Sequence, residues 1–209
     1  MKTLCFKVEV KSYLASNIWS DQLFGHVVWA IKALKGDDFL NQFIEKYKTA
    51  QKEVDFPMIF SSLFPFQYLP MPAMSFDLSA LFEDENSYKK VKKIKKARLV
   101  KYEFFAEISK SLTSGIDVEE LCNNIWTHRI EKKDFTHNTI DRESGKVLEG
   151  ALFVQEQTKH EEPLWFFVKI SENWEQLLRD ALKFIEIRGL GVDAATGAGK
   201  VRFIEENPE

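Results

Sequence analysis

The spacing of apolar residues along the chain predicts one strand followed by two helices. Over residues 3–10 every second side chain is apolar, the pattern of a strand with one buried face. Over 20–34, and again over 38–52, apolar residues recur at intervals of three and four, as in amphipathic helices. Ser20 is a candidate N-cap and Gly36 a candidate stop for the first helix. The predicted buried stripe of that helix comprises Leu23, Val27, Ala30, Ile31 and Leu34.

The last third of the chain carries the clearest pattern. Residues 151–157 and 164–170 each predict a strand, and the charged segment between them predicts a hairpin turn. Residues 172–188 predict a helix, and a glycine-rich stretch leads from it into a final strand over 200–204.

The middle of the chain is less regular. Four prolines between residues 57 and 72 exclude a regular helix and interrupt strand pairing, so this aromatic stretch predicts an ordered loop packed on the body. Residues 107–134 predict helix and loop. All the elements together follow the order β-α-β-β-α-β, which is typical of the ferredoxin-like, or RNA-recognition-type, α+β fold. In this interpretation residues 1–209 form a single domain, with a long insertion over about 36–149 after the first helix.

The composition excludes several classes of protein. The chain has 209 residues, of which 44% are hydrophobic, so it can bury a core and is not intrinsically disordered. The two cysteines, Cys5 and Cys122, lie far apart and have no metal-ligand spacing. We therefore expect no disulfide framework, no metal and no cofactor, and a reducing, cytoplasmic location. No stretch approaches the ~18 consecutive apolar residues of a transmembrane helix.

The positive charge is concentrated in one segment. Between Tyr88 and Tyr102 there are eight basic residues and no acidic one, which leaves 21 basic and 32 acidic residues for the rest of the chain. This basic island consists of Lys89, Lys90, Lys92, Lys93, Lys95, Lys96, Arg98 and Lys101. Such a segment is typical of a nucleic-acid-binding surface, although a solvated lysine-rich helix face gives the same pattern.

A second candidate site is the glycine loop, which we define as residues 189–199. It contains Gly189, Gly191, Gly197 and Gly199, and Lys200 and Arg202 follow it. Glycines permit positive φ and a close approach to a ligand, and successive N–H groups in such a turn can bind a phosphate. The segment is not a Walker A loop, because it runs from helix to strand and Val201 stands where a Ser or Thr should bind Mg²⁺.

A third candidate is a polar turn that precedes the strand predicted over 151–157. It contains His137, Asn138, Asp141 and Arg142. Arg142 could pair with a phosphate while His137 or Asn138 contacts a base or ribose. A purely structural interpretation is also open, in which Asp141 pairs with Arg142 and Gly145 closes the turn.

The sequence gives little support to catalysis. No motif of a serine hydrolase or a zinc peptidase is present. His26 lies between apolar residues and is more typical of a packed side chain than of a catalytic one, and His160 lies in the charged turn. A metal-independent ribonuclease that uses His128 or His137 as general base stays open. Phe66, Tyr68 and Tyr102 are the best candidates for stacking on bases.

Several segments, taken in order, resemble one known family. They are SDQLFGHVVWAIKAL, IFSSLFPFQYLPMP, KKIKKARLV, HNTIDRESGKVLEGALFVQE and GLGVDAATGAGKVRF. Together they resemble the RAMP (repeat-associated mysterious protein) superfamily over nearly the whole chain. Within it the chain looks most like the Csm-complex subunit of type III-A CRISPR effectors that caps the 5′ handle end of the guide RNA.

The resemblance implies a non-catalytic subunit that grips crRNA in antiviral defence, beside a large polymerase-like subunit and backbone RAMP subunits, with no membrane contact. Two positions depart from the family, Met71 where a lysine is common and Asp193 where relatives tend to be basic. The second ferredoxin-like domain usual in this family is also not found in these 209 residues. The family's motifs match the glycine loop with Lys200, the turn with His137, Asn138, Asp141 and Arg142, and the proline segment with Ser62, Phe64, Pro65, Leu69, Pro70 and Pro72.

These observations support one main hypothesis and two alternatives. The main hypothesis is that the glycine loop and the basic island converge in space to bind the RNA backbone. The predicted RNA-binding residues are Gly189, Gly191, Gly197, Gly199, Lys200, Arg202, His137, Asn138, Arg142, Lys92, Lys93, Lys95, Lys96 and Arg98. The alternatives are a CRISPR repeat-processing endoribonuclease of the same superfamily and a protein-interaction scaffold without RNA contact.

Overall fold

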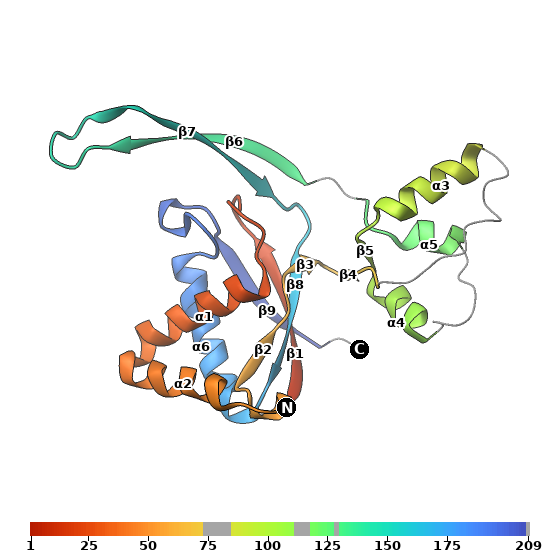
Figure 1. The fold of residues 1–209 in the computed structure, drawn as a ribbon, viewed down its shortest axis with the longest axis horizontal. Helices are drawn as coiled ribbons and strands as arrows, with labels where there is room; N and C mark the ends of the chain where they lie inside the picture. The colour runs from red at the N-terminus through yellow and green to blue at the C-terminus, as the bar shows by residue number, and fades with distance from the viewer. Residues whose placement is uncertain (73–84, 111–117, 128–129, 208–209) are drawn as a thin grey trace. The chain divides into compact units, whose positions relative to one another are not determined.

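The computed structural model describes residues 1–72, 85–110, 118–127 and 130–207 (Figure 1). The chain divides into two compact units. Unit 1 comprises Met1–Leu63 and Ile130–Glu209, and unit 2 comprises Phe64–Arg129. The elements of unit 1 are β1 (Lys2–Val10), α1 (Ser20–Lys35), α2 (Asp37–Thr49), η1 (Glu53–Asp55), β2 (Met58–Phe60), β6 (Glu131–Ile140), β7 (Val147–Lys159), β8 (Leu164–Ile170), η3 (Glu172–Trp174), α6 (Glu175–Arg188), η4 (Ala194–Thr196) and β9 (Val201–Glu206).

The core of unit 1 is an antiparallel sheet whose strands lie in the order β2-β8-β1-β9. β1 connects to β2 through α1 and α2, and β8 lies between these two strands in the sheet. Likewise, β8 connects to β9 through α6, and β1 lies between them. The strand predicted over residues 3–10 is confirmed, and Leu4, Phe6 and Val8 are buried in the main hydrophobic core as predicted. The alternation is not strict, because Cys5 is buried as well and Val10 only partly so. Phe6 stacks on Phe166 of β8 with 5.3 Å between ring centroids.

The predicted hairpin between residues 151–157 and 164–170 is wrong. β7 pairs with β6, whereas β8 has β1 along one edge and β2 along the other. A strand has only two edges for hydrogen bonding, so β8 has no place for β7. The second partner of β8 is the short strand Met58–Phe60. The sequence pattern does not predict this strand, because prolines lie close to it on both sides. The chain therefore leaves the sheet after β2, and α2 and β2, which fall inside the predicted insertion, belong to unit 1.

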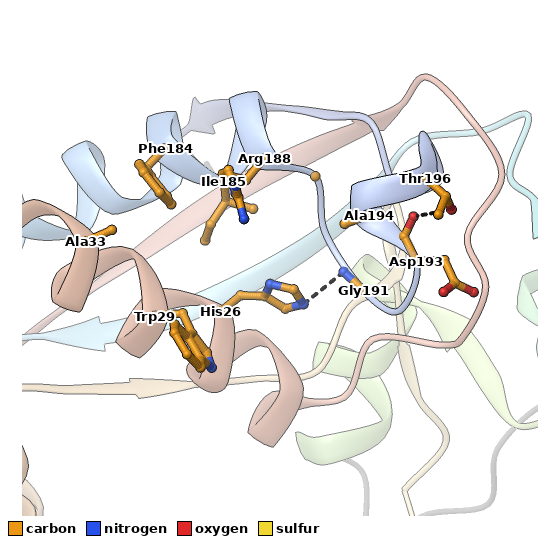
Figure 2. A pocket seen from close by; sticks show the side chains of 11 residues that line it. His26, Trp29, Ala33, Phe184, Ile185, Arg188, Gly191, Asp193, Ala194 and Thr196 are labelled. Carbon is orange, nitrogen blue, oxygen red and sulfur yellow. Dashed lines mark hydrogen bonds between the residues drawn. The ribbon is translucent and has the colours of Figure 1, made fainter. Parts of the chain in front are cut away.

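Three helices pack beside this sheet (Figure 1). The buried stripe of α1 contains Leu23, Val27, Ala30 and Ile31 as predicted, but Leu34 is 42% exposed. Ser20 is the first helical residue and not the cap. Trp19 occupies the cap position, where its N–H donates to Gln22 Oε1 at 3.2 Å. α6 buries Leu177, Leu178, Ala181, Leu182 and Ile185, as its pattern predicts. α1 and α6 lie side by side, and the glycine loop that follows α6 returns past His26 of α1 (Figure 2).

β6 and β7 form a long hairpin of their own. Most of its side chains are exposed, including Leu152, Phe153 and Val154. Its base is joined to the rest of unit 1 through Leu14, whose N–H donates to the carbonyl of Thr158 at 2.8 Å, and through Tyr13, whose ring meets Phe135 edge-on at 5.1 Å.

Unit 2 has its own small core. Its elements are β3 (Phe64–Pro65), β4 (Tyr68–Pro70), α3 (Glu85–Lys96), β5 (Leu99–Lys101), α4 (Tyr102–Lys110) and α5 (Val118–Asn124). β4 and β5 pair antiparallel, with Leu69 opposite Val100. Ile94, Val100, Phe104, Ile108, Leu121, Cys122 and Ile125 form the core. α3 turns Val91 and Ile94 inward, and its lysines are exposed except for Lys90, which is partly buried.

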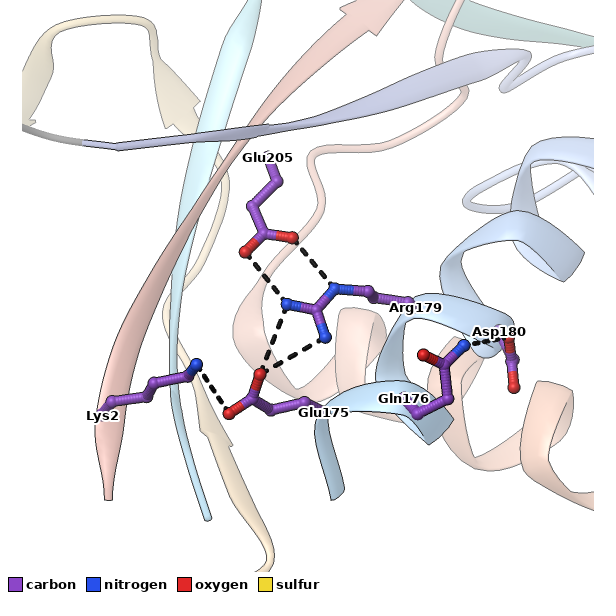
Figure 3. Close-up of polar contacts among 6 residues, drawn as sticks. All are labelled: Lys2, Glu175, Gln176, Arg179, Asp180 and Glu205. Carbon is purple, nitrogen blue, oxygen red and sulfur yellow. Dashed lines mark hydrogen bonds and ion pairs between the residues drawn. The ribbon is translucent and has the colours of Figure 1, made fainter. Parts of the chain in front are cut away.

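An ion-pair network links two strands of the sheet to α6 (Figure 3). Lys2 Nζ of β1 lies 2.8 Å from Glu175 Oε1. Arg179, one turn further along α6, contacts the other Glu175 oxygen at 3.3 Å and holds Glu205 of β9 through two nitrogens, at 3.0 and 3.1 Å. The hydrogen bond from Lys2, reinforced by Arg179, lowers the pKa of Glu175 below its ordinary value.

This lowered pKa predicts an acid-dependent loss of stability. A carboxylate whose pKa is lower in the folded state stabilises the fold above its unfolded pKa, about 4.3, and this contribution is lost as pH falls through the folded pKa. The drop in urea midpoint between pH 7 and pH 3.5, followed by circular dichroism, should therefore be smaller for Glu175→Gln than for the unmodified protein. Glu172→Gln, at an exposed position outside the network, is the control and should show the full drop. Equal drops in all three proteins would contradict the assignment.

Candidate nucleic-acid interface

The four glycines of the glycine loop have the backbone conformation that the sequence predicts. Their φ angles are +92° at Gly189, +93° at Gly191, +101° at Gly197 and +69° at Gly199. Side chains other than hydrogen are disfavoured in this region of φ. Asp193 also has a positive φ, +61°, so five residues of the loop lie in this region.

Two of these glycines also lie too close to neighbouring atoms to carry a side chain. A Cβ on Gly199 would lie 1.9 Å from the carbonyl oxygen of Leu190, and one on Gly189 would lie 2.8 Å from Cβ of Ala194. The two ends of the loop are joined here, since the Leu190 N–H donates to the Gly199 carbonyl at 2.8 Å. The glycines therefore allow the loop to close on itself.

The glycine N–H groups, predicted to face a phosphate, all have hydrogen-bond acceptors within the protein. Each of them donates a hydrogen bond within the protein: Gly189 to the Ile185 carbonyl (2.7 Å), Gly191 to His26 Nε2 (2.9 Å), Gly197 to the Ala194 carbonyl (3.3 Å) and Gly199 to the Tyr13 carbonyl (2.8 Å). A phosphate would have to break one of these bonds to be bound. The four glycine N–H groups are therefore engaged within the protein, and the role of the loop in an RNA site stays a prediction.

Residues 11–14, which follow β1, connect the glycine loop to the β6–β7 hairpin. On one side, Lys11 N–H donates to the Lys200 carbonyl at 2.7 Å and Lys200 N–H donates to Ser12 Oγ at 2.9 Å. On the other side, Tyr13 OH donates to Glu131 of β6 at 2.9 Å, and Lys133 Nζ lies 5.8 Å from the centre of the Tyr13 ring. The glycine loop and the base of the hairpin are thus held on one framework, with several cationic side chains around it.

The predicted residues around Asn138 do not all lie in a turn. His137 and Asn138 belong to β6, whereas Asp141 and Arg142 lie in the turn that follows it. His137 stacks on Phe153 of β7 with 5.3 Å between ring centroids. Asp141 Oδ1 accepts the Glu143 N–H at 2.8 Å, which lowers the pKa of Asp141, and Gly145 closes the turn with a φ of +68°. The Asp141 carboxylate is therefore engaged by the backbone.

The basic island forms part of α3, β5 and the link between them, in unit 2. Lys92, Lys95, Lys96 and Arg98 are exposed. Lys93 is exposed as well, and its Nζ donates to the Cys122 carbonyl at 3.1 Å. Lys90 pairs with Glu119 of α5 at 3.3 Å. Because the glycine loop lies in unit 1, the convergence of the two sites stays a prediction.

Two of the four histidines, His26 and His160, are desolvated by burial. His26 Nε2 accepts the Gly191 N–H, and burial lowers the pKa of His26, so this side chain is packed and hydrogen-bonded as its sequence context indicates. Burial also lowers the pKa of His160, which lies in the link between β7 and β8. His128 lies outside the described residues. Phe66, Tyr68 and Tyr102, the candidates for base stacking, are all partly buried in unit 2.

Comparison with known families accounts for nearly the whole chain. The family model described as the RAMP superfamily matches residues 11–202, from the segment after β1 to β9. The chain belongs to the RAMP superfamily. The match includes the glycine loop, the basic island and the hairpin of this RAMP protein. No curated protein matches it.

Solved structures with a similar fold come from CRISPR complexes. One is a chain of the crystal structure of a Csm1–Csm4 cassette in complex with cA4, which is 19% identical with a TM-score of 0.61, over 100% of this chain and 72% of that one. Another comes from the Csm3–Csm4 subcomplex in the type III-A CRISPR-Cas interference complex. It is 19% identical with a TM-score of 0.55, and the match covers 100% of this chain and 70% of that one. A third belongs to a type III-B Cmr-beta complex bound to cognate target RNA. It is 10% identical with a TM-score of 0.50, and the match covers 98% of this chain and 60% of that one. At these identities the likeness concerns the fold.

Sequence reasoning missed two features of this region. One is the segment of residues 11–14, whose sequence is typical of an ordinary loop. Its contacts with Glu131, Thr158, Gly199 and Lys200 come from distant parts of the chain. The other is Trp29, which is 69% exposed although it lies in α1 between Val28 and the buried Ala30. Its position off the buried stripe of α1 was the available signal. Within the described residues, no helix is both long and apolar enough to cross a membrane, and no group of three or more His, Cys, Asp or Glu side chains could hold a metal ion.

Proposed function

We propose that this RAMP protein is a non-catalytic subunit of a type III CRISPR effector complex that binds the 5′ handle of the crRNA. The order of β1, β2, β8 and β9 with α1 and α6 supports a ferredoxin-like core. In this assignment the protein acts in the cytoplasm, beside a polymerase-like subunit and backbone RAMP subunits. The Csm1–Csm4 and Csm3–Csm4 structures, which have the Csm4 subunit in common, support those partners.

The observation that carries the proposal is the framework around the glycine loop. Residues 11–14 tie the loop to the β6–β7 hairpin, and the exposed Lys200 and Arg202 follow the loop directly. A rigid loop flanked by cations suits a sugar-phosphate chain, which is bound by charge and shape. Unit 2 adds the exposed lysines of α3 as a second cationic surface.

The proposal predicts a marked dependence of RNA binding on salt. Each neutralised phosphate of a single strand contributes a slope of about −0.7 to the plot of log affinity against log salt concentration. Filter binding of a short unstructured RNA between 50 and 500 mM salt should give a slope of about −3 or steeper, corresponding to four or more phosphates. A flat dependence, or no retention of RNA, would refute RNA gripping and favour a protein-interaction scaffold.

The same RNA tests the nuclease alternative. We expect labelled CRISPR repeat RNA to remain intact when it is incubated with the protein in EDTA, because His26 accepts a backbone N–H and His137 stacks on Phe153. Specific cleavage that is lost in His137→Ala or His128→Ala would show that the protein is a metal-independent ribonuclease. Cleavage that persists in both variants would indicate a contaminating nuclease.

A further inference from the structure

A hollow of about 630 Å³ lies between α1 and α6, beside the glycine loop (Figure 2). We call it the α1–α6 hollow. Its walls are mostly apolar, with Trp29 and Ala33 from α1 and Phe184 and Ile185 from α6. Arg188, at the end of α6, and His26 complete the helical sides, and the glycine loop closes the remaining side through Gly189, Gly191, Asp193, Ala194 and Thr196.

Trp29 is the most unusual feature of this hollow. Its side chain is 69% exposed, and the ammonium of Lys32 lies 5.8 Å from the centre of its ring. Trp29 also lines a second, smaller hollow of about 280 Å³, which Gly191 and the half-exposed Val192 border on the loop side. The indole is therefore accessible to a ligand from both hollows. An exposed tryptophan with a cation beside it is a stacking surface for a nucleobase.

His26 couples the hollow to the glycine loop. Its Nε2 accepts the Gly191 N–H at 2.9 Å, and burial lowers the pKa of His26, so the ring is neutral at physiological pH. When Nε2 is the acceptor, the hydrogen of a neutral imidazole is on Nδ1. The histidine thus supplies an uncharged wall to the hollow and fixes the loop backbone next to Trp29.

The chemistry of the walls favours an uncharged ring inside the hollow. A phosphate would meet apolar side chains and the Asp193 carboxylate there, whereas a base would bury apolar surface on Trp29 and Phe184. Two cations lie next to the hollow, Arg188 in its lining and Lys32 over Trp29, while Asp193 adds a negative charge and Lys32 also pairs with Asp37 at 2.8 Å. These cations are suited to the phosphates on either side of an inserted base.

We propose that the α1–α6 hollow holds one unstacked nucleobase of the bound RNA strand, stacked on Trp29. This inference rests on the proposed function and adds to it that Trp29 binds a base by stacking. It also gives the glycine loop a function that its occupied N–H groups do not supply, because the loop forms the wall against which the base is held.

Trp29→Ala tests the proposal, since stacking of one base is worth about 1–3 kcal/mol, which corresponds to about a 5- to 150-fold loss of RNA affinity. The substitution removes a mostly exposed side chain, so the fold should be unaffected. Trp19→Ala is the matched control, because Trp19 is 56% exposed and does not line the hollow. Inorganic polyphosphate, which carries charge but no bases, should bind Trp29→Ala and the unmodified protein equally.

Fluorescence gives an independent measurement on the same protein. RNA should quench part of the tryptophan emission of the unmodified protein, and Trp29→Phe should lose that quenching while Trp19→Phe retains it. Unchanged RNA affinity and quenching in the Trp29 variants would overturn the proposal and leave the proposed function intact. A Trp29→Ala protein that binds RNA normally but no longer co-purifies with a partner subunit would show a protein-docking site instead. Failure of the unmodified protein to bind any RNA would overturn both the proposal and the proposed function.

Discussion

Replacing Gly199 by alanine should lower the free energy of unfolding by about 3 kcal/mol or more, which corresponds to a decrease of about 6–12 °C in Tm for a chain of this size. The added Cβ would lie 1.9 Å from the Leu190 carbonyl oxygen, a backbone atom that cannot move without opening the loop. In addition, alanine would have to adopt a φ of +69°. Thermal and urea unfolding followed by circular dichroism measure the effect. In the most severe case the Gly199→Ala variant would not accumulate as folded protein.

Gly197→Ala is the matched control for that experiment. Gly197 also has a positive φ, +101°, but a Cβ there meets nothing within 4 Å. Its expected cost is only that of the backbone conformation, about 1–2 kcal/mol. Equal stability of Gly199→Ala and Gly197→Ala would show that the clash with Leu190 is not the reason for glycine at position 199.

Converting Lys92, Lys95 and Lys96 together to glutamine should weaken RNA binding on the order of 10- to 100-fold at physiological salt. If each lysine neutralises one phosphate, the slope of log affinity against log salt becomes shallower by about 2. All three side chains are exposed on α3, away from the buried Val91 and Ile94, so the fold should tolerate the change. Filter binding across a salt series measures the affinity and the slope together.

The control for the α3 variant removes the same charge from another surface. Lys35, Lys48 and Lys52 are exposed residues at or near the ends of α1 and α2 in unit 1. Converting these three to glutamine changes the net charge equally. We expect less than about a threefold change in affinity, because none of the three lines the α1–α6 hollow or lies in the glycine loop. Equal losses in the two triple variants would mean that RNA responds to net charge and not to α3.

For the glycine loop, the sequence predicts the backbone conformation but not the partners of its N–H groups. The sequence places four glycines between a helix and a strand, and their positive φ angles follow from that composition. Whether their N–H groups face a ligand depends on what lies around them. In the folded protein His26 and Tyr13, far away in the sequence, accept two of those N–H groups.

The candidate functional residues divide in a similar way. The α3 lysines could be found from the sequence, because a run of like charges is visible without knowledge of the fold. Trp29 could not be assigned to an interface, because a tryptophan within an apolar helix is most often buried. Only the packing of α1 against α6 leaves it beside a hollow.

The sequence by itself determined the elements whose signals are local: β1, α1, α2, α6 and β9 follow from periodicity over neighbouring residues. The tertiary structure alone decided that Met58–Phe60 pairs with β8 and that β7 pairs with β6. Pairing is a choice among strands distant in the chain, and it is fixed by which side chains the sheet and its helices can bury together. A three-residue strand between prolines carries no periodicity from which that choice could be inferred.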